Sequence, residues 1–302
     1  MSSGLAVVGV PSSVGAHAPG QEKAPAAFRA AGLIERLRTD GQTVEDLGDL
    51  PVARYQPDRA RRRAQNADRV LDIARGTADQ VAAAAGRDAK VLVLGGDCTI
   101  QIGVVAGLVR TTERVGLVYV DAGFDLNTPT SVRLGFLDWM GIAHLVGEPD
   151  AVRELVEIGP RVPLLDFEDI EFLGTVRDEL TDWERELAAR QDVNVHWSED
   201  VATDPEGTAR RARSRLEPRV DRISVHFDVD VLDFIDFPAA DFPTINAGLT
   251  FDAAMRALEV LVASPKCAAL TVSEFNPDHV DPDHQLVTTF VQRLTETFRP
   301  RL

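Results

Sequence analysis

Short, nearly continuous apolar runs alternate with longer amphipathic segments along this chain. The apolar runs predict strands at residues 5–10, 44–47, 90–94, 115–120, 162–165, 193–197, 222–229 and 268–272. The amphipathic segments predict helices at 25–37, 57–85, 137–146, 175–190, 204–216, 250–262 and 285–297, and another that ends near residue 110. Unbroken apolar runs are typical of parallel strands that are covered on both faces. The alternation therefore predicts an α/β fold with three layers, α/β/α, around a mostly parallel central sheet.

Acidic residues follow four of these predicted strands. They are Asp97, Asp121 and Asp125, Asp228 and Asp230, and Glu274. The carboxyl ends of parallel strands share one edge of the sheet, where open α/β sheets bind ligands. Each such residue taken alone is also a common helix N-cap. Buried like charges need a shared cation or proton, so the set predicts one pocket that suits a hard or borderline divalent cation.

Composition and charge narrow the classes of function. The 302 residues, 44% of them hydrophobic, are enough for one large core, and no repeat or clear linker divides them, so we expect a single domain over 1–302. A net charge of −16 argues against a nucleic acid or an anionic membrane as partner. Cys98 and Cys267 predict no disulfide framework, which fits a reducing compartment. Neither a signal peptide nor a membrane-spanning segment is evident, so we expect a cytoplasmic protein that acts on a small molecule.

Five short motifs resemble those of the ureohydrolase superfamily, which contains arginases, agmatinases and formiminoglutamases. GGDC at 95–98 is similar to the family's GGDH, and DAGFDLNTP at 121–129 to its DAHxDxN segment. LDWMG at 137–141 falls where arginases carry LHGMP. FDVDVLD at 227–233 contains the family's D-x-D motif, and SEFNP at 273–277 is similar to its ExNP. The order and spacing of the motifs make the resemblance specific, and it covers nearly the whole chain.

The resemblance implies an arginase-like fold and hydrolysis of C–N bonds in guanidino, amidino or related groups. In that family two Mn²⁺ ions, held by four Asp and two His, share a hydroxide that attacks the guanidinium carbon. The aspartates carried over to this chain are Asp121, Asp125, Asp228 and Asp230. The family's acidic residue beside the guanidinium corresponds to Glu274, a candidate for both catalysis and substrate binding. Family analogy also implies a homo-oligomer.

Three of the family's histidines are replaced in this chain. The two metal-binding histidines correspond to Cys98 and Gly123, and the arginase-type proton-transfer histidine corresponds to Asp138. Asp138 is therefore a candidate ligand or acid/base. Cys98 leaves three alternatives: a small buried hydrophobe, a metal thiolate that favours Zn²⁺ or Fe²⁺ over Mn²⁺, or a nucleophile. We expect one divalent metal (Mn, Zn or Fe) or none, instead of the two-manganese cluster.

The substrate end of the site departs from the arginase pattern as well. Asn127 is retained, but Leu134 stands where arginases place a serine that contacts the amino acid's carboxylate. The family's R-D-x-D stretch becomes 165–168, which ends in Glu168, and Trp139 adds aromatic bulk. We expect Asn127, Trp139, Glu168 and Glu274 to contact the substrate, and the substrate not to be free arginine.

Two functions follow from these observations. The first is a divergent C–N hydrolase with an altered metal centre. The alternative is a catalytically inactive, metal-poor pseudoenzyme that serves as a binding or structural protein. The remaining histidine near the motifs, His226, lies two residues before Asp228, and we expect it to be buried and hydrogen-bonded rather than a ligand.

Overall fold

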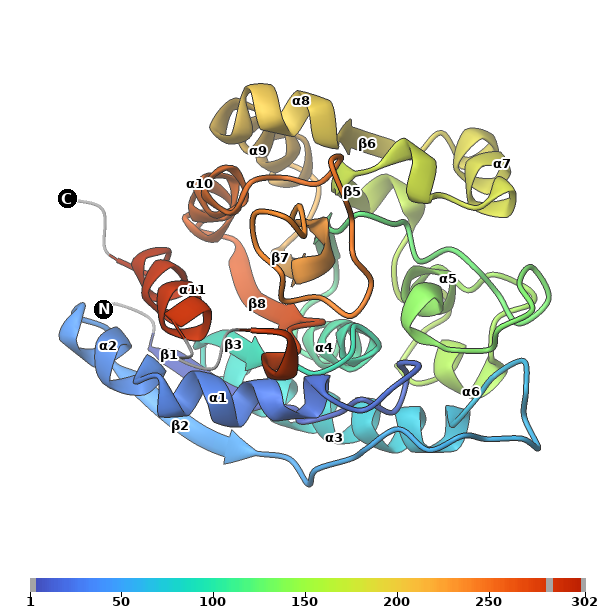
Figure 1. Ribbon diagram of the computed structural model, residues 1–302, viewed down its shortest axis with the longest axis horizontal. Coiled ribbons are helices and arrows are strands. Elements are labelled where there is room, and N and C mark those ends of the chain that lie inside the picture. Colours follow the sequence, from blue (N-terminus) through green and yellow to red (C-terminus); the bar gives the residue numbers. More distant parts are fainter. Residues whose placement is uncertain (1–3, 281–284, 300–302) are drawn as a thin grey trace.

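An eight-stranded parallel sheet forms the centre of the computed structural model, which describes residues 4–280 and 285–299 (Figure 1). The strands are β1 Leu5–Gly9, β2 Val44–Asp49, β3 Lys90–Leu94, β4 Val115–Val120, β5 Ile170–Thr175, β6 Asn194–Trp197, β7 Arg222–Asp228 and β8 Cys267–Ser273. Their order across the sheet is β2-β1-β3-β8-β7-β4-β5-β6, and every pairing is parallel. The predicted α/β fold is confirmed.

Helices cover both faces of the sheet and complete the three layers (Figure 1). They are α1 Ala24–Ala30, α2 Leu33–Thr39, α3 Ala67–Ala85, α4 Ile100–Leu108, α5 Gly141–Leu145, α6 Arg153–Val156, α7 Asp182–Gln191, α8 Ser198–Thr203, α9 Pro205–Leu216, α10 Phe251–Val262 and α11 Gln285–Glu296. Along β4, Val118 and Val120 pack with the core under α1, α2 and α8–α11, whereas Leu117 and Tyr119 pack with the core under α3–α7. Both faces of the central strands are therefore buried, which explains their unbroken apolar runs.

One predicted strand is wrong, and the error has a physical cause. Residues 162–165 form a loop, and the fifth strand is β5, which begins at Ile170. Glu171 interrupts the apolar run of β5, yet its side chain is fully buried. Its carboxylate oxygens lie 2.9 Å from Nε of Arg215 and 3.0 Å from Nε2 of His196. Arg215 on α9 and His196 on β6 thus make it possible to bury an acidic residue inside β5. A hydrophobicity pattern alone does not reveal such a strand.

Several predicted helices are shorter than expected. The segment 25–37 is divided into α1 and α2 at Gly32, whose φ of +83° interrupts the helical backbone. The segment 57–85 is helical only from Ala67. The segment 175–190 becomes α7 only from Asp182, because Thr181 and Glu184 form a capping box there.

Within the described residues, none of the helices has the length and apolar character needed to cross a membrane.

Candidate metal centre

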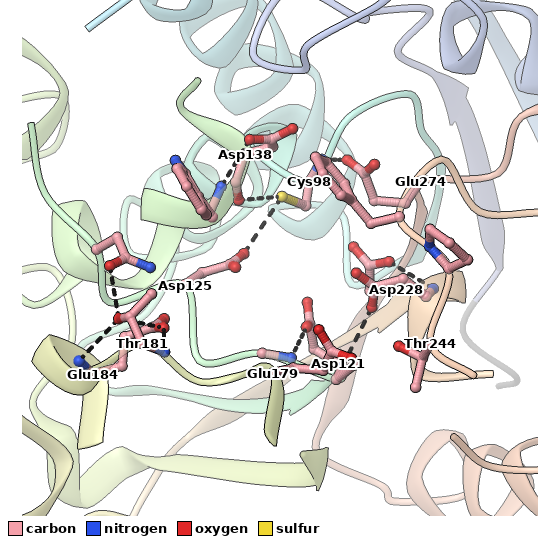
Figure 2. Close-up of a pocket in the computed structure, with 17 residues that line it drawn as sticks. Cys98, Asp121, Asp125, Asp138, Glu179, Thr181, Glu184, Asp228, Thr244 and Glu274 are labelled. Carbon is pink, nitrogen blue, oxygen red and sulfur yellow. Dashed lines mark hydrogen bonds between the residues drawn. The ribbon is translucent and has the colours of Figure 1, made fainter. Parts of the chain in front are cut away.

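A cavity of about 330 Å³ opens at the carboxyl ends of the central strands (Figure 2). Eight of its lining residues carry carboxyl groups: Asp121, Asp125, Asp138, Glu179, Glu184, Asp228, Asp230 and Glu274. The described residues that line it include no lysine, arginine or histidine. The structure therefore brings together the acidic residues of β4, β7 and β8 that the sequence places at strand ends, and adds others. Six of these eight residues are buried, whereas Asp230 is partly buried and Glu179 is exposed. The six buried carboxyl groups require protons or a bound cation.

The segment after β4 supplies Asp121 and Asp125. The Asp121 carboxylate accepts a hydrogen bond of 2.6 Å from the backbone N–H of Gly123, and Asp125 accepts one from the Tyr119 hydroxyl. Asp125 has a left-handed backbone, with a φ of +52°. Asparagine and aspartate tolerate this conformation better than most residues. The tight turn brings both carboxyl groups to the same cavity.

The end of β7 supplies Asp228 and Asp230. Asp228 accepts a hydrogen bond of 3.0 Å from the backbone N–H of Asp230 and one of 3.1 Å from the Ser273 hydroxyl on β8. Asp230 accepts a hydrogen bond of 3.4 Å from the backbone N–H of Ala122. These bonds connect the ends of three neighbouring strands, so the aspartates are positioned by the backbone of the sheet rather than by their own loops alone.

His226 lies one step behind Asp228, as expected. It is buried, its Nε2 is 3.0 Å from the Ser273 hydroxyl, and its ring stacks on Tyr119 with centroids 4.5 Å apart. Nδ1 of His226 lies 3.3 Å from the side-chain oxygen of Gln101. Burial lowers the pKa of His226 to about 3, so its imidazole is neutral at physiological pH. The ring supports the aspartates from behind, and it is not among the residues that line the cavity.

Cys98, Glu274 and Asp138 come together on the side of the cavity opposite Asp121 and Glu179 (Figure 2). The Cys98 thiol donates to the backbone carbonyl of Asp138 at 2.6 Å, and its sulfur is 3.5 Å from Oδ2 of Asp125. The Cys98 backbone N–H donates to Glu274 at 2.8 Å, and the Gln21 amide donates to the other oxygen of Glu274. The position expected to hold a family histidine thus carries a sulfur atom that contacts the Asp125 carboxyl group and the Asp138 backbone carbonyl.

Asp138 begins a short 3₁₀ helix, Asp138–Met140, which precedes α5. Its Oδ1 accepts a hydrogen bond of 3.0 Å from the backbone N–H of Trp139. Its Oδ2 has no hydrogen-bond partner among the described residues, although the side chain is only 5% exposed. A buried carboxyl oxygen without a partner is costly unless it is protonated or meets a ligand.

Two acidic residues that the sequence suggested for the site lie elsewhere. Asp97 does not line the cavity, because its carboxylate accepts hydrogen bonds from the Ser12 hydroxyl at 2.8 Å and the Gly15 backbone N–H at 3.2 Å. It fastens the loop after β1 to the end of β3. Glu168, expected to bind substrate, is also outside the cavity: it lies in the 3₁₀ helix Phe167–Asp169, before β5, and pairs with Arg114 and Arg219. It is at the amino end of β5 because the true strand begins later than the one predicted.

The cavity is lined instead by a set of three residues that follow β5 in the chain and that the sequence did not suggest for the site. They are Glu179, Thr181 and Glu184. Thr181 donates to the Asn127 side-chain oxygen at 3.0 Å, and Glu184 accepts the Leu126 backbone N–H at 3.2 Å. Because Thr181 is followed three residues later by Glu184, the capping-box pattern was readable from the sequence and could have placed the start of this helix. Asn127 and Trp139, both expected to contact substrate, line the cavity as well.

The cavity strongly disfavours ionisation of its carboxyl groups. Burial, reinforced by neighbouring carboxylates, holds the pKa values of Asp121, Asp125, Asp138, Asp230 and Glu274 well above their ordinary range. Burial also raises the pKa of Asp228 to about 7. Burial and the surrounding carboxylates raise the pKa of the Cys98 thiol, so the metal-free site contains a neutral thiol. A divalent cation would reverse this balance by stabilising the ionised forms.

The clustered carboxyl groups are expected to make the metal-free protein more stable as the pH falls from about 8 to about 5, against the opposite contribution of the buried His144 and His226, whose lowered pKa values keep them neutral in the folded chain. In this interval the folded carboxyl groups bind protons, whereas those of the unfolded chain, with a pKa near 4, remain ionised. The stability that protonated carboxyl groups contribute is therefore lost as the pH rises. The contribution of Asp228 is lost between its ordinary pKa and its folded-state pKa of about 7. Melting temperatures measured in excess chelator across this range test the prediction. A melting temperature that stays level or rises with pH contradicts it.

The comparisons with known proteins agree with this geometry. The family model described as the arginase family matches residues 3–296. An arginase from Bacillus caldovelox is 30% identical over 278 residues, which cover 90% of this chain and 91% of that protein. The structure of that arginase matches with a TM-score of 0.87 and covers 99% of both chains, and formimidoylglutamase from Bacillus subtilis shares the fold with a TM-score of 0.75. The chain belongs to the arginase family, in the ureohydrolase superfamily, as the motifs predicted.

Proposed function

We propose that this protein hydrolyses a C–N bond in a guanidino, amidino or related cationic group, at a metal centre altered from that of its relatives. The observation that carries the proposal is the cavity itself, in which eight residues have carboxyl groups and no lining residue is cationic among those described. Such a cavity suits a divalent cation together with a cationic organic group. A site that had lost all function would gain nothing from burying so many acidic groups.

The residues in the cavity divide into those that would hold a metal and those that would act on the substrate. Asp121, Asp125, Asp228 and Asp230 would hold a divalent cation, and Cys98 lies beside them. Bound there, a divalent cation supplies a polarising charge and an activated water at neutral pH. The donors do not fit the family's two-manganese pattern, because no imidazole lines the described cavity and Gly123 offers no side chain.

Asp138 and Glu274 are the candidate catalytic residues. Burial, reinforced by Asp97 and Asp125, raises the pKa of Asp138 in the metal-free site, which favours a protonated side chain that would deliver its proton to a leaving amine. Glu274 would act on the reacting group either as a direct partner of the guanidinium or through the metal. Asn127 and Trp139, which also line the cavity, would contact the remainder of the substrate. The acidic residues Glu179 and Glu184 would repel a carboxylate on that part of the substrate.

The test is turnover by the purified chain after reconstitution with Mn²⁺, Zn²⁺ or Fe²⁺ separately. Ammonia and urea release should be measured with matched guanidino and amidino compounds that either carry a carboxylate or lack one. We expect turnover with at least one metal, better activity with the compounds that lack a carboxylate, and loss of activity in Asp228→Asn. Failure to turn over any compound with any of these metals would overturn the proposed hydrolase.

A second candidate is a pseudoenzyme that binds a cationic ligand without hydrolysing it. The specific observation in its favour is that sulfur replaces imidazole at Cys98 and nothing replaces it at Gly123. Calorimetric binding of the same compounds separates the two candidates. Tight binding without turnover in every metal would support the pseudoenzyme, whereas turnover that depends on Asp228 would exclude it.

A further inference from the structure

Three buried donors of different types meet on one side of the cavity. One atom each from Cys98, Asp228 and Glu274 lies within 4.8 Å of the others. These residues come from the ends of β3, β7 and β8, three neighbouring strands (Figure 2). Asp125, from the segment after β4, places a further oxygen 3.5 Å from the Cys98 sulfur. A thiol and carboxylates at such separations are donors that a cation of the Zn²⁺ type can gather by small movements of the side chains.

A second observation in the same cavity points to a missing ligand. Asp138 lines the same cavity, and its Oδ2 is buried and has no hydrogen-bond partner among the described residues. No lysine or arginine among the described lining residues compensates these carboxyl groups. The cavity therefore lacks a positive charge at the place where the thiol and carboxyl groups converge.

We propose that the cavity binds one Zn²⁺-type cation through the Cys98 thiolate, Asp228 and Glu274, with Asp125 beside them, in place of a two-manganese cluster. This inference rests on the proposed function and deepens it: Glu274 is assigned to the metal rather than directly to the substrate, and Asp121 and Asp230 are left outside this ligand set. On binding, the Cys98 S–H bond breaks, the sulfur keeps the electron pair and binds the cation, and the proton passes to solvent. A thiolate ligand favours Zn²⁺ and Co²⁺ over the harder Mn²⁺.

The local geometry also explains why Glu274 is well placed to serve as a metal ligand. Its backbone N–H donates to the Gly96 carbonyl at 2.8 Å, and its side chain accepts the Cys98 backbone N–H. The loops after β3 and β8 are therefore held together before any metal arrives. A pre-arranged pair of ligands from two strands loses little freedom when a cation binds.

The decisive experiment loads the metal-stripped full chain with Co²⁺ and records its absorption spectrum. We expect one Co²⁺ per chain and a thiolate-to-cobalt charge-transfer band. The band should disappear in Cys98→Ser and persist in Cys267→Ser, a matched control because Cys267 is buried at the start of β8, away from the cavity. A cobalt complex of the unmodified chain without this band would overturn the inference, whatever the variants do.

Calorimetric titrations with Zn²⁺ and Mn²⁺ test the ligand set further. Most sites prefer Zn²⁺ to Mn²⁺, so the informative quantity is the change in that preference. We expect Cys98→Ser to reduce it by roughly tenfold or more, equivalent to about 1.4 kcal/mol, and Glu274→Gln to weaken Zn²⁺ binding by a similar factor. An unchanged preference in Cys98→Ser, unchanged binding in Glu274→Gln, two equivalents of Zn²⁺ per chain, or no binding would each overturn the inference.

These results separate the inference from the proposed function. One thiolate-bound metal in a protein that hydrolyses nothing would support the metal site and contradict the hydrolase. Turnover with Mn²⁺ that survives Cys98→Ser unchanged would support the hydrolase and contradict the metal site. Near-ultraviolet circular dichroism of each variant shows whether a loss of binding reflects loss of the fold, and the cobalt spectrum of the unmodified chain tests the site without any variant.

Discussion

Hydrolysis of free L-arginine by the unmodified protein is expected to be negligible, well below the rate on the order of 1 s⁻¹ that is common for enzymes. The main reason is the metal centre. An attacking hydroxide at neutral pH requires the pKa of bound water to fall from about 15.7 toward about 7. The family achieves this with two manganese ions, and the corresponding imidazole ligands are absent at Cys98 and Gly123.

Substrate anchoring gives a second, smaller reason. Leu134, aligned with an arginase serine, is 57% exposed and does not line the cavity. An amino-acid carboxylate would thus lose a hydrogen-bond partner, at a cost of roughly 1–3 kcal/mol, and would face Glu179 as well. Proton delivery changes as well, because Asp138 stands where arginases carry an imidazole, and in the metal-free site burial raises the pKa of its carboxyl group. The metal centre should therefore dominate the loss.

Restoring both imidazoles in a Cys98→His, Gly123→His double variant is expected to increase Mn²⁺ binding and arginine hydrolysis. A Cβ at residue 123 would lie 3.4 Å from the nearest atom, Oδ1 of Asp121, an ordinary contact that permits a side chain. Urea release and metal content should be measured together, with Cys98→Ser, Gly123→Ala as the matched control. Rapid urea release by the unmodified protein would show that these substitutions have been misinterpreted.

The second large effect is expected in stability: Asp228→Asn should abolish the influence of a chelator on the melting temperature. A metal at a hundred times its Kd stabilises the folded state by about 2.7 kcal/mol, and a chelator removes that contribution. Asp228 belongs to both groups of buried donors that lie within 4.8 Å of one another, with Cys98 and Glu274 and with Asp121 and His226. Its loss should thus prevent metal binding at either group.

The same substitution should not destabilise the metal-free protein. Because burial raises the pKa of Asp228 to about 7, its ionised form opposes folding at neutral and higher pH, and an amide removes that charge. Melts at about pH 8 in excess chelator should show Asp228→Asn to be at least as stable as the unmodified chain. Glu168→Gln is the matched control, since Glu168 lies outside the cavity and should leave the chelator effect intact. A chelator effect that survives Asp228→Asn would place the metal elsewhere.

The sequence by itself determined the parallel sheet and most of the acidic residues at its edge. The run 115–120 is apolar on both faces of β4, and the two aspartates after it are only four residues apart, so local patterns were sufficient to bring Asp121 and Asp125 to one turn. The motifs likewise identified the family and the substitutions at Cys98 and Gly123. All of these features depend on residues that are close together in the chain. Hydrophobic periodicity reveals the strands directly, and the short motifs are contiguous in sequence.

Only the tertiary structure decided the features that depend on distant partners. Glu171 could enter a buried strand because Arg215 and His196 pair with its carboxyl group. That strand begins later than predicted, so Glu168 precedes it and lies outside the predicted site. Hydrogen bonds from Ser12 and Gly15, which are far away in sequence, hold the Asp97 carboxylate outside the cavity. The meeting of Cys98, Asp228 and Glu274 likewise required three strand ends to be placed side by side. A buried polar group is stable only with the right partners, and those partners are contributed by the fold rather than by adjacent residues.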